Sequence, residues 1–522
     1  MTQNNRSVAR SAGILMASFV AANLAGLLRQ MLINRAFGAG TALDEYFAAF
    51  RVPDLLFNLL AGGALGSAFL PVLTGQLLSN SRPAAWALAS ALLNSLCIVL
   101  LLLAGLTAWF APAITRSLLA PGWDAQQVAR TVQLMRIMLL STAVFGASSV
   151  LMSVHHAHNH FLAPALAPVL YNAGIAAGAV WLAPHYGVSG LAYGVVLGAL
   201  LHLLAQLPPL WRYAPQYRAH LGLADPQLRR VAALMAPRVF GLAAWQVNFW
   251  VNTAVASTLP AGSLAALVIA FQIFTFPQAV IAQALATALF PRFSAMAARG
   301  EYAALRDTLA ASLRAALYLT LPATAGMWLL GRPLLRLLFE SSAFDSAATQ
   351  MVYWALVWYA LGLAAHCGVE LAARAYYALH DTRTPLLAGS AAVVLNVGLS
   401  PLLAFIFMRV HWLPHGGPAL ANTIATTLEL ALLLLWLHSA LQPGAANRAA
   451  MRQTVLRSGT AALLMSAALA AWLAVAPAST LVTSLVGLLL GGAVYWVATL
   501  ALASPEARLL PQLLLRRRPE SE

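Results

Sequence analysis

Residues 37–73 read FGAGTALDEYFAAFRVPDLLFNLLAGGALGSAFLPVL, and this segment is the most informative about the fold class. It is long and apolar enough to cross a bilayer, which takes about 20 residues of helix. Yet it carries Asp44, Arg51 and Asp54, and charges inside a membrane helix generally face a protein cavity. Pro53 interrupts the helix among these charges and frees backbone groups there. We therefore predict a membrane helix with a polar, functional face.

The rest of the chain has the same character. Of 522 residues, 61% are hydrophobic and only 9% are charged, whereas soluble domains carry about 25% charged residues. No Asp, Glu, Lys or Arg lies between residues 82 and 116, 160 and 212, 238 and 292, or 457 and 506. This pattern excludes a large soluble core and predicts an all-α polytopic membrane protein. The predicted spans, about fourteen, cover residues 11–35, 42–78, 84–111, 131–154, 162–183, 188–210, 231–257, 263–296, 309–338, 347–379, 386–408, 419–441, 455–475 and 480–503.

The arginines predict the orientation. The net charge is +15 and every basic residue is arginine, but no clustered basic face of the kind that binds nucleic acid is present. Arg6 and Arg10 precede the first span, and the C-terminal tail carries Arg516 to Arg518. The loops on the opposite side hold mainly Arg116 and Arg409. The positive-inside rule therefore predicts that both termini are cytoplasmic.

An internal repeat is visible. Residues 64–71 read ALGSAFLP and residues 284–291 read ALATALFP. Each follows a proline within an apolar span, Pro53 or Pro277, and a short Ala-Gly turn precedes each span. Repeated halves are typical of transporters, whose substrate site lies between the halves near the membrane midplane. We predict a six-helix N-terminal lobe at 1–220, a six-helix C-terminal lobe at 221–445, and two further helices with a basic cytoplasmic tail at 446–522.

Polar residues within the spans are the candidate cavity residues. On the second span, Asp44, Arg51, Asp54 and Asn58 follow one another at spacings that place them on one helical face. Two explanations stay open, a substrate cavity or hydrogen bonds that only hold helices together, with Asp44 or Asp54 pairing the arginine. The candidates on the first, seventh and eighth spans are Asn23, Arg29, Gln246, Asn252 and Gln272.

These residue types fit a lipid diphosphate that carries a sugar. Such a headgroup needs arginine donors for its phosphates and a polar wall for its sugar. Two bundles that rock against each other supply both without opening a pore. Enzyme motifs are absent, and a Walker A loop would need a lysine. The sequence thus predicts a transporter rather than an enzyme, with no cofactor.

Two further groups have alternative interpretations. His155, His156, His158 and His160 form a run that could bind metal, but no second ligand cluster accompanies it. We expect a solvated or headgroup-facing turn and no metal site. Glu370 and Glu429 are candidate carboxylates for a coupling ion, with pairing of Glu370 to Arg374 as the simpler explanation.

Residues 37–73 closely resemble the first loop and second helix of the MurJ (MviN) family of lipid II flippases. RAYYALHDTRTP at residues 374–385 and FLAPALAPVLYN at residues 161–172 are similar to further segments of that family. The resemblance implies a fourteen-helix member of the multidrug/oligosaccharidyl-lipid/polysaccharide exporter superfamily. It also implies an inner-membrane location, a role in peptidoglycan assembly by alternating access, and an association with cell-wall synthesis machinery.

Asp44, Arg29 and Arg51 match the family's charged positions, but several other positions depart from its pattern. Family members usually carry a cation at Asn23, an arginine at Phe57 or Asn58, and an acid at Gly62, and they have an Asp-Arg pair at Phe271-Gln272. These differences leave other substrates possible.

Our first choice of function is the transport of lipid II from the cytoplasmic to the periplasmic leaflet. The alternatives are another polyprenyl-diphosphate-linked oligosaccharide, a drug or ion antiporter of the same superfamily, and a non-transporting scaffold. The sequence leaves the coupling ion, or the use of membrane potential, unassigned.

Overall fold

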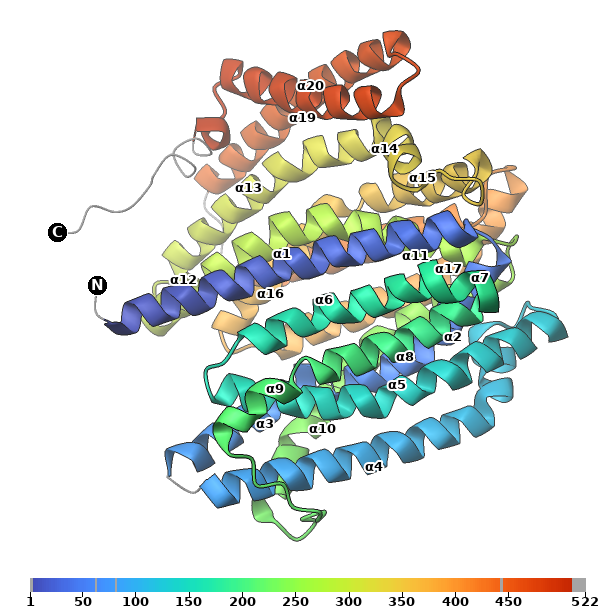
Figure 1. The fold of residues 1–522 in the computed structure, drawn as a ribbon. Coiled ribbons are helices and arrows are strands. Elements are labelled where there is room, and N and C mark those ends of the chain that lie inside the picture. The colour runs from blue at the N-terminus through green and yellow to red at the C-terminus, as the bar shows by residue number, and fades with distance from the viewer. Residues whose placement is uncertain (1–2, 62, 80–81, 442–444, 509–522) are drawn as a thin grey trace. The chain divides into compact units, whose positions relative to one another are not determined.

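The computed structural model describes the chain except residues 1–2, 62, 80–81, 442–444 and 509–522. Its described residues form helices joined by turns, without a strand (Figure 1), so the predicted all-α fold is confirmed. Gly62 and the predicted basic tail at Arg516 to Arg518 lie outside the described residues. The chain divides into two compact units, one of residues 1–264 with 341–344, and one of residues 265–340 with 345–522. The predicted six-helix lobes at residues 1–220 and 221–445 stay predictions.

In the first unit, α5 and α6 each pack against several other helices. Helix α5 packs against α2, α4 and α8, and α6 packs against α1 and α8. Its elements are α1 (Gln3–Phe37), α2 (Thr41–Leu56), η1 (Phe57–Ala61), α3 (Gly63–Leu78), α4 (Arg82–Ile114), η2 (Thr115–Leu119), α5 (Ala125–Ala157), α6 (Leu162–Ala177), η3 (Gly178–Leu182), α7 (Ala183–Tyr186), α8 (Ser189–Leu204), α9 (Leu207–Leu210), η4 (Trp211–Tyr213) and α10 (Pro226–Ser257).

The second unit includes the last two helices. Helix α19 packs against α13 and α20, while α18 packs against α15, α16 and α17. Its elements are α11 (Ser263–Gln278), η5 (Ala279–Gln283), α12 (Ala284–Ala298), α13 (Tyr302–Leu329), α14 (Gly331–Phe339), α15 (Ser346–Ala360), α16 (Leu363–Ala378), α17 (Arg383–Arg409), α18 (Gly416–Leu441), α19 (Ala445–Val475) and α20 (Thr480–Ala501).

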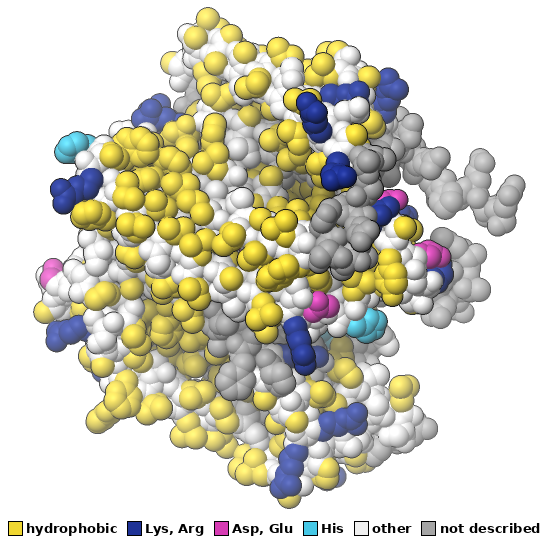
Figure 2. Space-filling view, turned by 180° about the vertical axis from the view of Figure 1, so that it is seen from behind, with side chains coloured by type: hydrophobic (Ala, Val, Ile, Leu, Met, Phe, Trp, Pro, Cys, Tyr) yellow, Lys and Arg dark blue, Asp and Glu magenta, His cyan; other side chains and the backbone are white. Residues whose placement is uncertain are grey.

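The helices have the length and surface of membrane spans. Among the described residues, ten helices are long and apolar enough to cross a bilayer, or twelve if each of two bent helix pairs counts as one span. The helices α1 and α10 are outside that count but have 35 and 32 residues, which is long enough to cross. The predicted number of fourteen therefore stays a prediction. Large apolar side chains such as Trp109 and Leu489 are 79% and 75% exposed, and hydrophobic side chains cover much of the face in Figure 2.

The repeat seen in the sequence extends to the backbone. Helix α2 has 16 residues, followed by a five-residue π segment and the 16-residue α3. Helix α11 also has 16 residues, followed by a five-residue π segment and the 15-residue α12. The expected helix breaks at Pro53 and Pro277 do not end the helices, because both prolines lie inside α2 and α11. Proline donates no hydrogen bond to the helical ladder. The wider π pattern begins a few residues later, at Phe57 after Pro53 and at Ala279 after Pro277.

A second pair of turns repeats in the same way. After α5, the N–H of His160 donates to the carbonyl of His155 at 2.9 Å, and after α16 the N–H of Asp381 donates to Tyr376 at 3.0 Å. Asn159 and His380 hold the left-handed conformation at these turns, with φ of 55° and 62°. The two halves therefore share local backbone geometry as well as sequence.

Asp381 explains part of the second sequence signature. Its Oδ1 accepts hydrogen bonds from the backbone N–H groups of Arg383 and Thr384, each at 3.0 Å. The Thr384 hydroxyl donates to Oδ2 at 2.6 Å. These hydrogen bonds, with that hydroxyl first, hold the pKa of Asp381 below its ordinary value of 3.8. The carboxylate thus satisfies the exposed N–H groups that begin α17.

Glycines allow α6, and the segment η3 that continues it, to approach α8 closely. A Cβ added to Gly174 would lie 2.3 Å from the Cα of Gly198, and one added to Gly178 would lie 2.7 Å from the Cα of Gly194. These contacts are with backbone atoms, which cannot move as a side chain can. Small residues at such crossings let membrane helices pack by van der Waals contact.

We predict that Gly174→Ala destabilises the protein by about 1–3 kcal/mol, because the methyl group overpacks this crossing. The control is Gly105→Ala in α4, where an added Cβ meets no atom within 4 Å. That change should be neutral or slightly stabilising, because alanine favours helix over glycine. Thermal unfolding of both purified variants in detergent checks the prediction. Equal unfolding temperatures for the two variants would contradict it.

Candidate functional site

Arg51 is anchored between α2 and α10. Its Nε donates a hydrogen bond to the Thr253 hydroxyl at 3.1 Å, and its guanidinium carbon lies 5.2 Å from the centre of the Phe249 ring. Thr253 in turn donates to the Phe249 carbonyl at 2.7 Å. A neutral hydroxyl and an aromatic face therefore orient the guanidinium.

Asp54 lies in the same polar group. Its carboxylate is close enough to Arg51 for an electrostatic interaction, and it is hydrogen-bonded with the side chains of Asn58 and Gln246. The Asn58 amide also donates to the backbone carbonyl of Asp54 at 2.9 Å, beside the π segment that follows Pro53. The structure thus adds Gln246 of α10 to Arg51, Asp54 and Asn58, which the sequence predicts on one helical face.

Arg29 on α1 approaches this group from another side. It interacts electrostatically with Tyr46 of α2 and Tyr171 of α6, and Tyr171 also interacts with Asp54. The Nε of Arg29 is buried and has no hydrogen-bond partner among the described residues. Within that part of the chain no carboxylate forms an ion pair with Arg29. A buried guanidinium donor without an acceptor is unfavourable, so the geometry favours an external anion here.

We name Arg29, Tyr46, Arg51, Asp54, Asn58, Tyr171, Gln246 and Thr253 the basic cluster. It lies wholly within the first unit. The sequence did not lead us to expect Tyr46 and Tyr171 at this site. Both are phenols within apolar spans, and a buried phenol hydroxyl usually has a hydrogen-bond partner, which is the signal that could have identified them.

Asp44 is set apart from the basic cluster. It lies ten residues before Asp54, about 15 Å along the helix. It is buried, and its Oδ2 accepts a hydrogen bond from the backbone N–H of Gly262 at 2.6 Å. Gly262 has a φ of 86°, which glycine adopts without strain. Asp44 therefore joins the start of α2 to the turn that precedes α11.

The other predicted cavity residues are spread more widely. Asn23 is exposed on α1, six residues before Arg29, and Asn252 is half-buried on α10 beside Thr253. Gln272 belongs to the second unit, where its backbone carbonyl accepts a hydrogen bond from the Thr275 hydroxyl at 2.9 Å.

Aromatic rings occupy two positions where the resemblance led us to expect charges. Phe57 packs on Phe145 with ring centres 4.8 Å apart, and Phe145 packs on Tyr171 at 4.9 Å. In the second unit, Phe271 packs on Tyr359 at 5.3 Å. Apolar packing therefore occupies both positions.

The two candidate coupling carboxylates differ. Glu370 forms an ion pair with Arg374 at 2.6 Å, one helical turn away, which is the simpler of the two explanations. Glu429 forms no ion pair with any described residue. Its Oε1 lies 3.3 Å from where a Cβ on Gly389 would be, so the carboxylate packs against the backbone of α17.

The expectation of a solvated histidine turn is wrong for His155. This side chain is fully buried, and its ring nitrogens contact the Gln206 carbonyl at 2.8 Å and the Tyr213 hydroxyl at 3.3 Å. His158 stacks on the same tyrosine ring at 4.1 Å. The run is thus part of the packing between α5 and the segment after α8. Among the described residues, no group of three or more candidate ligands could hold a metal ion.

Comparison with known proteins gives a consistent family. The family model described as "Lipid II flippase MurJ" matches residues 33–500. The lipid II flippase MurJ of Burkholderia cenocepacia is 31% identical over 451 residues, which cover 79% of this chain and 86% of that protein. The probable lipid II flippase MurJ of Vibrio cholerae is 29% identical over 448 residues, 83% of each chain.

The fold is similar to solved transporters. A structure of lipid II flippase MurJ in an inward closed conformation matches with a TM-score of 0.76 and 23% identity, covering 96% of this chain and 99% of that chain. An inward-facing multidrug resistance transporter of the MATE family matches with a TM-score of 0.66 and 16% identity, covering 81% of this chain and 94% of that chain. Both likenesses concern the fold and fit the superfamily that the sequence indicated.

We predict that Asp44→Ala lowers the free energy of unfolding by about 1.5–3 kcal/mol, the usual contribution of a hydrogen bond to a charged group. Asp44→Asn keeps an oxygen that accepts from Gly262, so it should retain most of the stability. Thermal unfolding of the purified proteins measures both effects. If Asp44→Asn were as unstable as Asp44→Ala, the hydrogen bond to Gly262 would not be the interaction that matters.

Proposed function

This chain belongs to the MurJ family of lipid II flippases, and from that premise we propose that it carries lipid II across the membrane with Arg29 and Arg51 as its diphosphate contacts. The observation that supports this most strongly is the buried Nε of Arg29, which lacks a partner among the described residues. Guanidinium groups form short, bidentate hydrogen bonds with phosphate oxygens. A diphosphate would satisfy this donor and balance the charge of the basic cluster.

The remaining residues of the basic cluster suit the sugar portion of the substrate. Asp54, Asn58 and Gln246 supply acceptors and donors on one wall. Tyr46 and Tyr171 offer hydroxyl groups and apolar rings beside Arg29. Because Thr253 fixes the orientation of Arg51, this guanidinium is positioned before the substrate arrives, which reduces the entropy lost on binding.

We assign the transport step to alternating access by the two repeat-related lobes, from the cytoplasmic to the periplasmic leaflet. The repeated π segments after Pro53 and Pro277 support this, because π segments interrupt helical hydrogen bonding where transporters place substrate sites. The protein is a multi-pass membrane protein. Its arginine distribution supports an inner-membrane orientation with both termini in the cytoplasm.

Cation coupling is a separate part of the proposal. Glu429, which has no ion pair among the described residues, is the carboxylate we assign to a coupled proton or cation, because a carboxylate alone in a membrane span favours a bound cation. This assignment also keeps an ion-coupled antiporter as the second candidate function. Purified protein in vesicles separates the two, since an antiporter would exchange a cation for a drug or a second ion in the absence of lipid II.

We predict that Arg29→Ala and Arg51→Ala each reduce lipid II flipping by at least about tenfold, because each loses a charge-assisted phosphate contact. The control is Arg409→Ala at the end of α17, whose guanidinium lies over the exposed Phe405 ring. Growth of a strain depleted of its own lipid II flippase, together with the amount of lipid II reaching the outer leaflet, measures the effect. Full rescue by both variants would exclude the basic cluster as the diphosphate site. If the well-expressed wild type failed to rescue, the substrate would be another lipid-linked glycan.

A further inference from the structure

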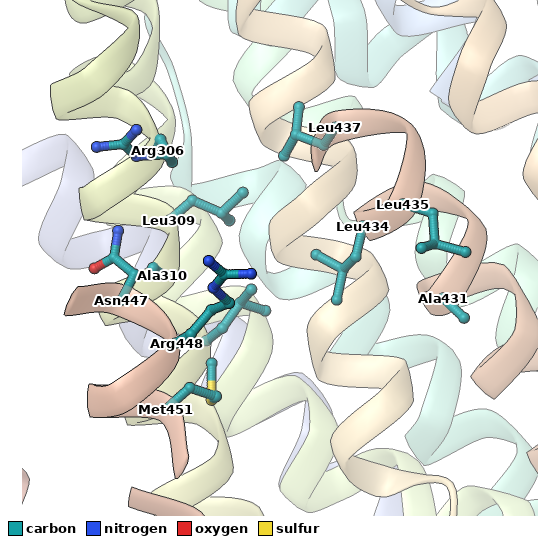
Figure 3. A pocket seen from close by; sticks show the side chains of 11 residues that line it. Arg306, Leu309, Ala310, Ala431, Leu434, Leu435, Leu437, Asn447, Arg448 and Met451 are labelled. Carbon is teal, nitrogen blue, oxygen red and sulfur yellow. The ribbon is translucent and has the colours of Figure 1, made fainter. Parts of the chain in front are cut away.

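A groove lies within the second unit between α13, α18 and α19. Its volume is about 580 Å³, and side chains including Leu309, Leu434, Leu437 and Met451 form its apolar walls. Figure 3 shows these walls, with Leu309 on one side and Leu434 and Leu437 on the other. The groove is separate from the basic cluster, because all its lining residues belong to the second unit.

The groove is placed at one end of its helices. Arg306 and Leu309 come from the first two turns of α13, Leu437 from the last turns of α18, and Arg448 from the first turn of α19. The positive-inside rule predicts that this end faces the cytoplasm. The groove therefore lies at the depth where the headgroups of the cytoplasmic leaflet meet their acyl chains.

The arginines at the groove differ in their pairing. The Nε of Arg306 donates to Asp307 at 2.9 Å, and the Asn447 amide donates to the same carboxylate oxygen at 2.7 Å. Arg448 forms no ion pair with any described residue. Its guanidinium projects from α19 into the space between α13 and α18 (Figure 3). The groove thus combines apolar walls with one uncompensated cation.

We propose that this groove binds an anionic phospholipid of the cytoplasmic leaflet, with its phosphate on Arg448 and an acyl chain along the leucine walls. An apolar space of this size is unfavourable for water but suits a hydrocarbon chain. Positive charge at the cytoplasmic surface attracts anionic headgroups. The occupant joins α13 and α18 to α19, so it stabilises the attachment of the two C-terminal helices.

The chemistry of the groove argues against a sugar-bearing lipid. A glycan headgroup presents many hydroxyl groups that need partners. Among the described lining residues only Arg306, Asn447 and Arg448 have polar side chains, and Asp307 already engages the first two. A small phosphate headgroup matches this limited supply of donors. The proposal is therefore independent of the flippase substrate.

The test measures lipid binding to the full chain in detergent by native mass spectrometry and thermal unfolding. Phosphatidylglycerol is compared with phosphatidylcholine of the same acyl chains, with glycerol phosphate as the free headgroup and with a polyprenyl diphosphate. We expect phosphatidylglycerol to bind at least about tenfold more tightly than phosphatidylcholine and to raise the unfolding temperature. Glycerol phosphate should have no effect, because it lacks the chain that fills the groove.

Variants locate the site. Arg448→Ala should abolish the preference for phosphatidylglycerol, whereas Arg448→Lys should retain part of it because the charge remains. Leu434→Trp fills the groove and should weaken binding of both phospholipids. Arg409→Ala, an exposed arginine elsewhere in the same unit, should behave as the wild type. The proposal is overturned if the wild type binds both phospholipids equally, if Arg448→Ala keeps the preference, or if polyprenyl diphosphate displaces phosphatidylglycerol at lower concentration. If Arg448→Ala does not fold, the comparison of Arg448→Lys with Leu434→Trp decides.

Discussion

A guanidinium group within a membrane protein needs an anion, and the account of this transporter depends on that constraint. Moving an ion out of water is unfavourable by several kcal/mol even after the protein relaxes around it. Arg51 has a hydroxyl, an aromatic ring and the nearby Asp54, so its charge is partly accommodated by the fold. Arg29 interacts with the two phenols, Tyr46 and Tyr171, and its buried Nε has no acceptor among the described residues. The first unit therefore contains a buried donor that a phosphate oxygen would satisfy.

Helix contacts near the basic cluster position the elements that carry it. Helices α6 and α8 pack closely through glycines, and Tyr171 lies on α6 at this crossing. Asp44 ties the start of α2 to the turn before α11. The π segment after Pro53 then lies between this fixed end and α3.

The sequence predicted much of the fold, since hydropathy reports directly on helices that face lipid. The predicted spans beginning at residues 162 and 480 begin at Leu162 and Thr480 in the structure. Hydropathy could not predict the π segments, because a π segment differs from the α-helix in its hydrogen-bond pattern and not in residue polarity. It also could not reveal that the partner of Asp44 is a backbone N–H group, which has no signature in the sequence. The burial of His155 was missed because a run of histidines looks polar whether or not a tyrosine and a carbonyl cover it.

The candidate site was predicted only in part, for a related reason. The spacing of Arg51, Asp54 and Asn58 identifies one helical face, but neighbours on other helices depend on packing. Tyr171 and Arg29 are far apart in the sequence, and only the fold brings them together.

In the proposed function Arg29 holds the diphosphate of the substrate. The dissociation constant for lipid II, measured for the purified wild type and for Arg29→Gln, tests this role. The account predicts binding at least about tenfold weaker in the variant, with its folding unchanged. Equal dissociation constants for the two proteins would contradict it.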